Sequence, residues 1–401
     1  MEGWPLRTLG DLVTLQRGID LPDVKRREGN VPIMGSFGIT GRHAAAACKG
    51  PGVTVGRSGA SIGTVAFIGE DYWPLNTCLY VKDFHGNSPL FAFYFLKTMD
   101  LAAHNSGSAQ PSLNRNFVHP LPIRFPALPE QRAIAATLGA LDDKIELNRR
   151  MNETLEAMAR ALFRDWFVDF GPTRAKMAGA PPYLSEDLWS LFPDRLDDDG
   201  KPEGWVVGNL GQIAQSKNRG VSPSDVHEDT PYIGLEHMPR GSIALADWEG
   251  AGKVTSNKSA FSVGDFLFGK LRPYFHKVGI APVSGICSTD IVVVSSRTPA
   301  WHAFVIACIS DEYFVAYTDK TATGTKMPRT SWPVMAKYKL AIPPEPLAQR
   351  FNLTIAPYLE RIMVNIKESR TLAETRDLLL PRLMSGELRL AGVDPVLEEV
   401  L

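Results

Sequence analysis

The feature of this sequence that most constrains its fold is an internal repeat. Three short motifs recur in the same order, at a nearly constant offset of roughly 200 residues. The motifs are Gly3-Trp4, SGSAQP (106–111) and PALPEQR (126–132) in the first half, and Gly204-Trp205, TGTKMP (323–328) and PEPLAQR (344–350) in the second. The 401-residue chain is therefore predicted to fold as two similar units.

Both copies show the same order of local patterns. Short apolar runs such as GVTVG (52–56) and DFLFG (265–269), separated by Gly, Pro, Asn and Ser, predict strands joined by turns. One helix-like run follows in each copy (90–102 and 303–317), then a proline-rich hinge and a long helix.

The predicted class is α+β, with two similar mixed α/β domains separated by a pair of long antiparallel helices, an intramolecular coiled coil with a pseudo-twofold repeat. The predicted boundaries are 1–128 for the first domain, 129–170 for the first long helix, 171–204 for a linker, 205–346 for the second domain, 347–385 for the second long helix and 386–401 for a tail.

The two long helices carry an apolar stripe with heptad spacing. Such a stripe often marks ordinary core packing, but two of them in one chain favour an antiparallel pair in which each buries its stripe against the other. Polar positions within each stripe are expected to set the register. Pro357 and Pro381 are expected to kink or end the second helix. The predicted seam residues are Ile134, Leu138, Leu141, Ile145, Asn148, Asn152, Leu155, Leu162, Ile355, Leu359, Ile362, Ile366, Leu380 and Leu383.

Composition narrows the class of protein without identifying a function. With 44% hydrophobic and 22% charged residues, the chain resembles ordinary globular proteins. No run approaches the roughly 18 apolar residues that span a bilayer, and the N-terminus lacks a signal-peptide pattern. Four cysteines without a CxxC pair favour a cytoplasmic location without disulfides. The net charge of −1 hides two mildly basic blocks (1–128 and 205–346), weak support for an anionic ligand.

Two patterns resemble enzyme motifs but lack a required feature. APPY (180–183) is similar to an amino-methyltransferase motif, yet Ala180 has no group that hydrogen-bonds a target amine. Asp194, Asp199 and Lys201 imitate the order of metal-dependent nucleases. Carboxylates of that kind lie on separate strand ends to share a metal, whereas these lie in one short stretch rich in Asp and Gly. Neither HxxxH nor GxSxG occurs, so no catalytic and no metal-ligating residue is predicted.

The stretch GDFLFGKL (264–271) is one residue short of a phosphate-binding P-loop. Leu271 stands where the P-loop has a magnesium-binding hydroxyl, and Pro273 argues against a helix that begins at Lys270. The matching stretch of the first copy, GVTVGRSGA (52–60), has different glycine spacing. Both copies share an apolar strand, a glycine and then a basic residue, Arg57 or Lys270, which predicts a strand-to-turn element.

The whole pattern resembles the specificity subunits of type I restriction–modification systems. The residues that carry the resemblance are the segment from PALPEQR to RDWFVDF (126–170) and its second copy ending in LLLPRLMSGEL (378–388), together with the twofold order of variable block, hinge and long helix. The resemblance covers essentially the whole chain. It implies two target-recognition domains, each reading half of a bipartite DNA site, and a helix pair that sets the spacer between the halves and docks modification subunits.

The resemblance also implies what the chain leaves to its partners. The chain would have no catalytic residue and bind no cofactor. Two modification subunits would bring S-adenosylmethionine and methylate adenine, and two restriction subunits, where present, would bring ATP and Mg²⁺. The third expected partner is double-stranded DNA, and no membrane is expected.

The residues that read DNA are predicted at the repeated turns, because Arg and Lys suit guanine or phosphate and Asn and Gln suit adenine. Each of them is alternatively an ordinary surface or turn residue. In the first copy they are Arg57, Ser58, Ser106, Ser108, Gln110, Asn114, Arg115 and Asn116. In the second copy they are Lys270, Arg272, Tyr274, Lys277, Thr323, Thr325, Lys326 and Arg329.

Two other classes of function remain open. A stand-alone ATP- or S-adenosylmethionine-dependent DNA enzyme would turn over its cofactor without partners. A coiled-coil scaffold would show no sequence preference on DNA.

Overall fold

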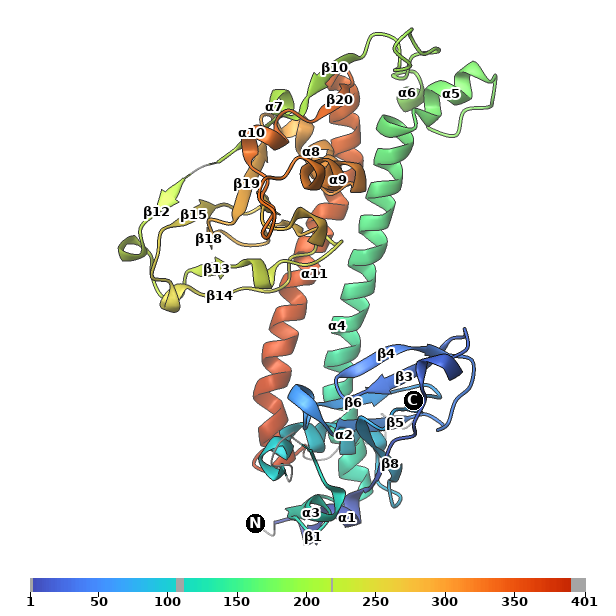
Figure 1. Cartoon of the computed structure of the whole chain (residues 1–401), viewed down its shortest axis with the longest axis vertical. Helices are drawn as coiled ribbons and strands as arrows, with labels where there is room; N and C mark the ends of the chain where they lie inside the picture. Colours follow the sequence, from blue (N-terminus) through green and yellow to red (C-terminus); the bar gives the residue numbers. More distant parts are fainter. Residues whose placement is uncertain (1–2, 106–111, 218, 391–401) are drawn as a thin grey trace. The chain divides into compact units, whose positions relative to one another are not determined.

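The computed structural model describes residues 3–105, 112–217 and 219–390. Contacts divide the chain into two compact units: unit 1 is Met1–Lys144 with Leu372–Leu401, and unit 2 is Ile145–Thr371. Two long helices, α4 (Leu128–Phe163) and α11 (Glu345–Met384), each contribute residues to both units (Figure 1). Sheets and helices occur in each unit, so the predicted α+β class is confirmed. Among the described residues, no helix is long and apolar enough to cross a membrane.

Unit 1 is built on a four-stranded antiparallel sheet in the order β2-β8-β5-β6, with a three-stranded sheet β4-β3-β7 and a pair β1-β9. Its core joins strand β5 to both long helices, since Val55, Ile134, Leu138 and Leu383 are all fully buried in one cluster. The elements before α4 are β1 (Leu6–Thr8), α1 (Leu9–Leu12), β2 (Thr14–Arg17), β3 (Val31–Gly35), β4 (Gly38–His43), β5 (Gly52–Gly56), β6 (Val65–Ile68), β7 (Trp73–Pro74), β8 (Cys78–Asp83), α2 (Pro89–Thr98), α3 (Arg115–Val118) and β9 (Pro122–Arg124).

Unit 2 repeats this plan. Its four-stranded antiparallel sheet has the order β11-β19-β16-β17, beside a five-stranded sheet β12-β15-β18-β13-β14 and a pair β10-β20. The elements are β10 (Val206–Asn209), α7 (Leu210–Ile213), β11 (Ala214–Ser216), β12 (Gly220–Val221), β13 (Pro231–Ile233), β14 (Glu249–Gly250), β15 (Lys258–Phe261), β16 (Phe266–Gly269), β17 (Val278–Ile280), β18 (Gly285–Cys287), β19 (Ile291–Ser296), α8 (His302–Ile309), α9 (Glu312–Lys320), α10 (Trp332–Met335) and β20 (Lys339–Ile342). Strand β16 thus occupies the sheet position of β5, which confirms the alignment of the two copies at Lys270 and Arg57.

The segment between α4 and β10 is helical in part. A π-helical turn, Arg164–Val168, continues α4, and the short helices α5 (Gly171–Met177) and α6 (Glu186–Trp189) follow. The turn places Phe167 against Phe351 of α11, with ring centroids 5.0 Å apart, and Trp166 lies 5.5 Å from the same ring. This aromatic cluster belongs to the main core of unit 2 and fixes the two helices to each other there.

The structure revises part of two expectations about helices. Of the two outcomes expected at Pro357 and Pro381, a kink or an end, neither proline ends α11, which is one helix through both positions. Both prolines are exposed, so the carbonyls that they leave without a helical partner can bind water. The helix-like run at 303–317 is two helices, α8 and α9, because Asp311 accepts a hydrogen bond from the backbone of Tyr313 (2.9 Å) and starts a new helix there.

Candidate nucleic-acid interface

In both units, a loop begins directly after the strand that carries the repeated glycine. In unit 1 the Gly56 amide donates to the carbonyl of Thr64 (2.7 Å), and in unit 2 the Gly269 amide donates to the carbonyl of Lys277 (2.9 Å). A Cβ atom on Gly56 would lie 2.0 Å from the carbonyl oxygen of Ser61, so only glycine fits there. The basic residue that follows each glycine is therefore the first residue of an equivalent closed loop.

This geometry excludes a P-loop at GDFLFGKL. Lys270 follows strand β16 and begins no helix, and the first helical residues after it are the 3-10 turn Pro273–Phe275. A phosphate cradle depends on a helix whose first amides face the phosphate groups. Lys270 is thus a loop residue at the end of β16, an inner strand of its sheet.

A second segment joins each loop at the same place. The carbonyl of Arg57 accepts from the Leu113 amide (2.8 Å), and the carbonyl of Lys270 accepts from the Thr330 amide (3.0 Å). The structure therefore brings two groups of predicted DNA-binding residues together in each unit: the turn after the glycine, and the segment that precedes α3 or α10. Ser106, Ser108 and Gln110 lie outside the described residues.

The predicted side chains of unit 1 differ in how freely they face solvent. Arg57 donates from Nη1 to the carbonyl of Asn76 (3.0 Å), which holds its partly buried guanidinium in place. The Asn114 side chain accepts from the Asn116 amide (3.0 Å) and caps α3. Arg115 and Asn116 are exposed, and Ser58 is partly buried in a bridge to Ser112.

The predicted side chains of unit 2 form a more basic group. Thr323, Thr325, Lys326 and Arg329 are exposed, and the Arg329 guanidinium lies 3.1 Å from the Asp290 carboxylate. Lys270 and Arg272 are partly buried and form no ion pair with another described residue, and Tyr274 is half exposed.

Lys277 points inward instead. Its ammonium group donates to the carbonyl of Leu235, and burial, aided by the nearby charge of Arg240, lowers the pKa of Lys277. This hydrogen bond attaches the loop to the segment that carries Leu235.

The sequence reasoning missed Arg240 and Phe275. The Arg240 guanidinium lies over the Phe275 ring, 4.3 Å from its centroid. Nothing at the level of the repeat singles out Arg240, because it comes from a different turn, 30 residues before the loop it touches. An aromatic pair in the loop, Tyr274 and Phe275, was the available signal for a cation-binding surface.

Polar side chains occupy the seam between α4 and α11 in unit 2. The Asn365 amide donates to Oδ1 of Asn152 (2.9 Å), and Asn148 donates to Oε2 of Glu368 (2.8 Å) and to Oγ of Ser369 (3.2 Å). As positions rise on one helix they fall on the other, so the two helices are antiparallel here. In unit 1, Arg376 of α11 donates to Asp142 of α4 (2.5 Å). All fourteen predicted seam residues are buried or partly buried.

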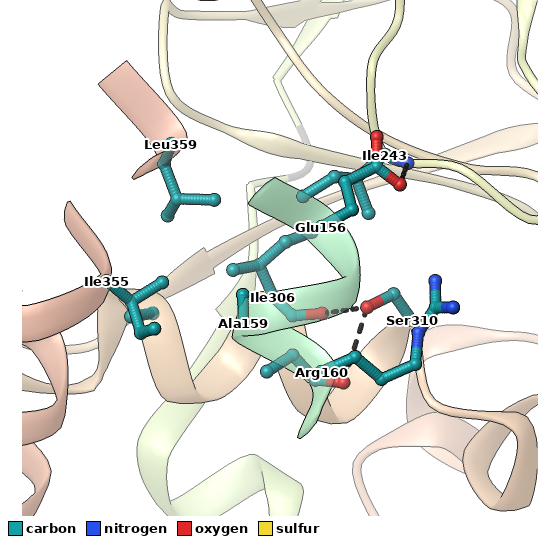
Figure 2. A pocket seen from close by; sticks show the side chains of 10 residues that line it. Glu156, Ala159, Arg160, Ile243, Ile306, Ser310, Ile355 and Leu359 are labelled. Carbon is teal, nitrogen blue, oxygen red and sulfur yellow. Dashed lines mark hydrogen bonds between the residues drawn. The ribbon is translucent and has the colours of Figure 1, made fainter. Parts of the chain in front are cut away.

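Glu156 attaches the sheet part of unit 2 to α4. Glu156 is 7% exposed, and its carboxylate accepts from the Ser242 hydroxyl (2.7 Å) and the amides of Ile243 (3.0 Å) and Ala244 (3.1 Å). Burial raises the pKa of Glu156 despite these hydrogen bonds. Figure 2 shows this carboxylate turned toward the backbone of Ile243, beside a cavity of about 20 Å³ that is large enough for one water molecule.

One group of side chains in unit 2 has the composition of a metal site. Ligand atoms of Glu236, His237 and Glu249 lie within 4.8 Å of one another. Nδ1 of His237 already accepts from the Gly234 amide (2.9 Å), and both carboxylates are exposed. Exposed acids of this kind gather without a metal, so we assign no ion to them.

Comparisons with known proteins agree on one family. Residues 1–157 match the family model described as "Type I restriction modification DNA specificity domain". The chain is 27% identical over 319 residues to the type I restriction enzyme MjaIX specificity subunit of Methanocaldococcus jannaschii, covering 75% of this chain and 69% of that protein. It is 24% identical over 387 residues to the HindI specificity subunit of Haemophilus influenzae, covering 79% and 82%.

A solved structure shares the fold. The type I restriction–modification S subunit from M. genitalium superposes with a TM-score of 0.62 over 95% of this chain and 96% of that one, at 17% sequence identity.

Proposed function

The chain belongs to the DNA specificity subunits of type I restriction–modification systems, and from this premise we propose that each of its units reads one half of a bipartite DNA site. The observation that carries the proposal is the duplicated loop, with Arg57 in unit 1 and Lys270 in unit 2 at equivalent positions after an equivalent strand. One backbone plan with different side chains at its reading positions is suited to two different half-sequences.

The helix pair has a separate part in the proposal. We propose that α4 and α11 set the length of the unread spacer and dock two modification subunits. Antiparallel packing locked by Asn152 and Asn365 supports a fixed length. Exposed apolar side chains on the helices of unit 2 support docking of a protein, since water alone does not favour them. They are Leu147, Met151, Met158, Leu353 and Val364.

The chemistry belongs to partners in this proposal. The chain is a non-catalytic specificity subunit. The modification subunits supply S-adenosylmethionine and methylate adenine, and restriction subunits, where the system has them, supply ATP and Mg²⁺. The cytoplasm is the proposed location, which is compatible with four cysteines that are all free thiols.

Selection from random duplex DNA tests the proposal. The full chain, co-purified with its modification subunit, is mixed with a duplex library at fixed salt, and bound duplexes are sequenced. Two short sequences separated by a spacer of constant length are expected. Enrichment of one continuous sequence would contradict the half-site proposal, and no enrichment at all would favour a protein scaffold.

A control addresses the enzyme alternative. The purified chain alone, incubated with labelled S-adenosylmethionine or ATP, is expected to show no turnover. Turnover by the chain alone would show that it is a stand-alone enzyme.

A further inference from the structure

The loop after β16 has a left-handed backbone at two positions, and its counterpart in unit 1 has glycine at the equivalent positions. In unit 1 the loop has two residues with positive φ, Gly59 (79°) and Gly63 (82°). Counted from the basic residue after the strand, the same two positions in unit 2 are Arg272 (50°) and His276 (51°). The two loops also share a backbone hydrogen bond. In unit 1 the Ile62 amide donates to the carbonyl of Gly59 (3.2 Å), and in unit 2 the Phe275 amide donates to the carbonyl of Arg272 (2.9 Å).

This left-handed conformation is strained for a residue with a Cβ atom and unstrained for glycine. Unit 2 therefore holds two strained residues at positions where the same fold demonstrably accepts glycine. Strained non-glycine residues concentrate at functional sites, where the side chain is needed. The side chains of Arg272 and His276 each have an environment that explains their presence.

His276 fixes the loop to the helices of unit 2. Its Nε2 donates to the carbonyl of Ser310 (2.9 Å), at the junction of α8 and α9, and its own carbonyl accepts from the Gly241 amide (2.9 Å). The second of these contacts holds the turn that carries Arg240 against the loop.

Arg272 and Arg240 share one aromatic ring. Their guanidinium carbons lie 6.0 Å and 4.3 Å from the centroid of the Phe275 ring. Neither arginine side chain forms an ion pair with another described residue, and neither donates a hydrogen bond to one. Two cations on one ring leave donor groups for a partner with acceptor atoms.

We propose that Arg272 and Arg240, held on the Phe275 ring, form the guanine-reading element of unit 2, and that His276 is its positioning residue. This inference rests on the proposed function. A guanidinium that already rests against an aromatic ring loses less freedom than one free in solvent when it donates two hydrogen bonds to O6 and N7 of guanine. Phosphate contact is the competing source of the same attraction, and the test separates the two.

The test compares Arg272→Gly with the unchanged full chain in complex with its modification subunit. Dissociation constants are measured at one salt concentration for the selected duplex, for duplexes altered in either half-site and for a non-specific duplex. Because glycine suits the left-handed backbone, Tm is expected to stay unchanged or rise. Affinity for the selected duplex is expected to fall about 5- to 150-fold, with lost discrimination in one half-site only.

Lys339→Gln provides the charge control, since Lys339 is an exposed cation of the same unit and lies on β20, outside the proposed docking helices. It is expected to leave half-site discrimination unchanged. If Arg272→Gly weakened binding to all duplexes equally, Arg272 would be a phosphate contact and the proposal would be wrong. Unchanged binding would also overturn it. If the unaltered chain selected no duplex at all, the proposed function itself would fail.

His276 is tested by a pair of variants. His276→Gly keeps the backbone and removes the hydrogen bond to Ser310, whereas His276→Asn tolerates the backbone and retains an N–H donor. Discrimination in the same half-site is expected to fall about tenfold in His276→Gly and to recover in part in His276→Asn. A lower Tm in His276→Gly with intact discrimination would reduce the residue to a structural role and contradict its positioning role.

Discussion

Glu156 shows how a single charged residue joins two parts of unit 2. Its carboxylate meets three donors from the 242–244 segment while it sits on α4. A charged residue next to a heptad seam is ordinarily an exposed residue, so the helix pattern alone predicts the opposite environment. Its burial depends on a segment almost 90 positions away in the chain.

Replacing Glu156 by Ala should destabilise unit 2 by about 2–4 kcal/mol, because the buried Ile243 amide and the Ser242 hydroxyl lose their acceptor, while the Ala244 amide keeps only its hydrogen bond to Oγ of Ser242. Glu153→Ala is the matched control, one turn away on the same helix. The Glu153 side chain is 59% exposed, so its loss should change stability by less than about 1 kcal/mol. Denaturant titration of both variants measures the difference. Equal effects would contradict the role given to Glu156.

The pKa of Glu156 gives a pH prediction of defined sign. Burial raises it above the usual 4.5, so the folded state binds the proton more tightly than the unfolded chain does. Between pH 4.5 and the raised pKa, stability due to this group should therefore decrease as pH rises. The unfolding free energy of the native chain minus that of Glu156→Gln should be larger at the acidic end of this window. A difference that grows with pH would have the wrong sign.

Variants of Arg57 and Lys270 test whether each unit recognises a different half-site. Arg57→Ala should weaken recognition of one half-site, and Lys270→Ala should weaken recognition of the other, each by about 1–3 kcal/mol. Binding to duplexes altered in either half measures this. Equal loss on every duplex, including non-specific DNA, would make both residues backbone contacts.

At the scale of elements, periodic patterns in the sequence predict the long helices, whereas local exceptions carry no signal in it. The heptad spacing predicted the seam, and residues such as Ile355 and Ile362 are buried in it. Helix α11 continues through Pro357 because tertiary packing of its apolar face outweighs one missing hydrogen bond. The strained loop positions Arg272 and His276 were invisible, because neither residue type signals a left-handed backbone.

The Asn152–Asn365 pair should behave as a coupled unit within the helix pair. Either residue changed alone to Ala leaves a buried amide without its partner and should cost about 1–3 kcal/mol. Changing both to Leu should cost less than the two single changes together, because no buried polar group remains unpaired. A double-mutant cycle by denaturant titration measures the coupling. Strictly additive effects would contradict it.

At the scale of the whole molecule, duplication is what made the architecture predictable. Three recurring motifs identified the two units, and the order of strands in their main sheets confirms the repeat. The individual residues of the candidate interface are less predictable, because the two copies share the backbone of the loop but differ in its side chains, as at Gly59 and Arg272. Arg240 contacts the Phe275 ring of the loop only because the fold brings a separate turn beside it, and the sequence carries no signal of that contact.

The spacer proposal predicts a defined change in target spacing. One heptad inserted after Asn148 and another after Glu368 would keep the seam aligned and lengthen the pair by about 10 Å. At about 3.4 Å per base pair, the preferred spacer should lengthen by about three base pairs. A heptad inserted in α4 alone misaligns the seam and serves as the control, with a lower Tm expected. An unchanged spacer in the double insertion would contradict the proposal.

The most direct test of the central claim is a map of methylated adenine in cells that express this chain with its modification subunit. We predict a single bipartite motif with a constant spacer, which disappears when this chain is omitted. A motif that persists without this chain, or a continuous motif, would contradict the claim.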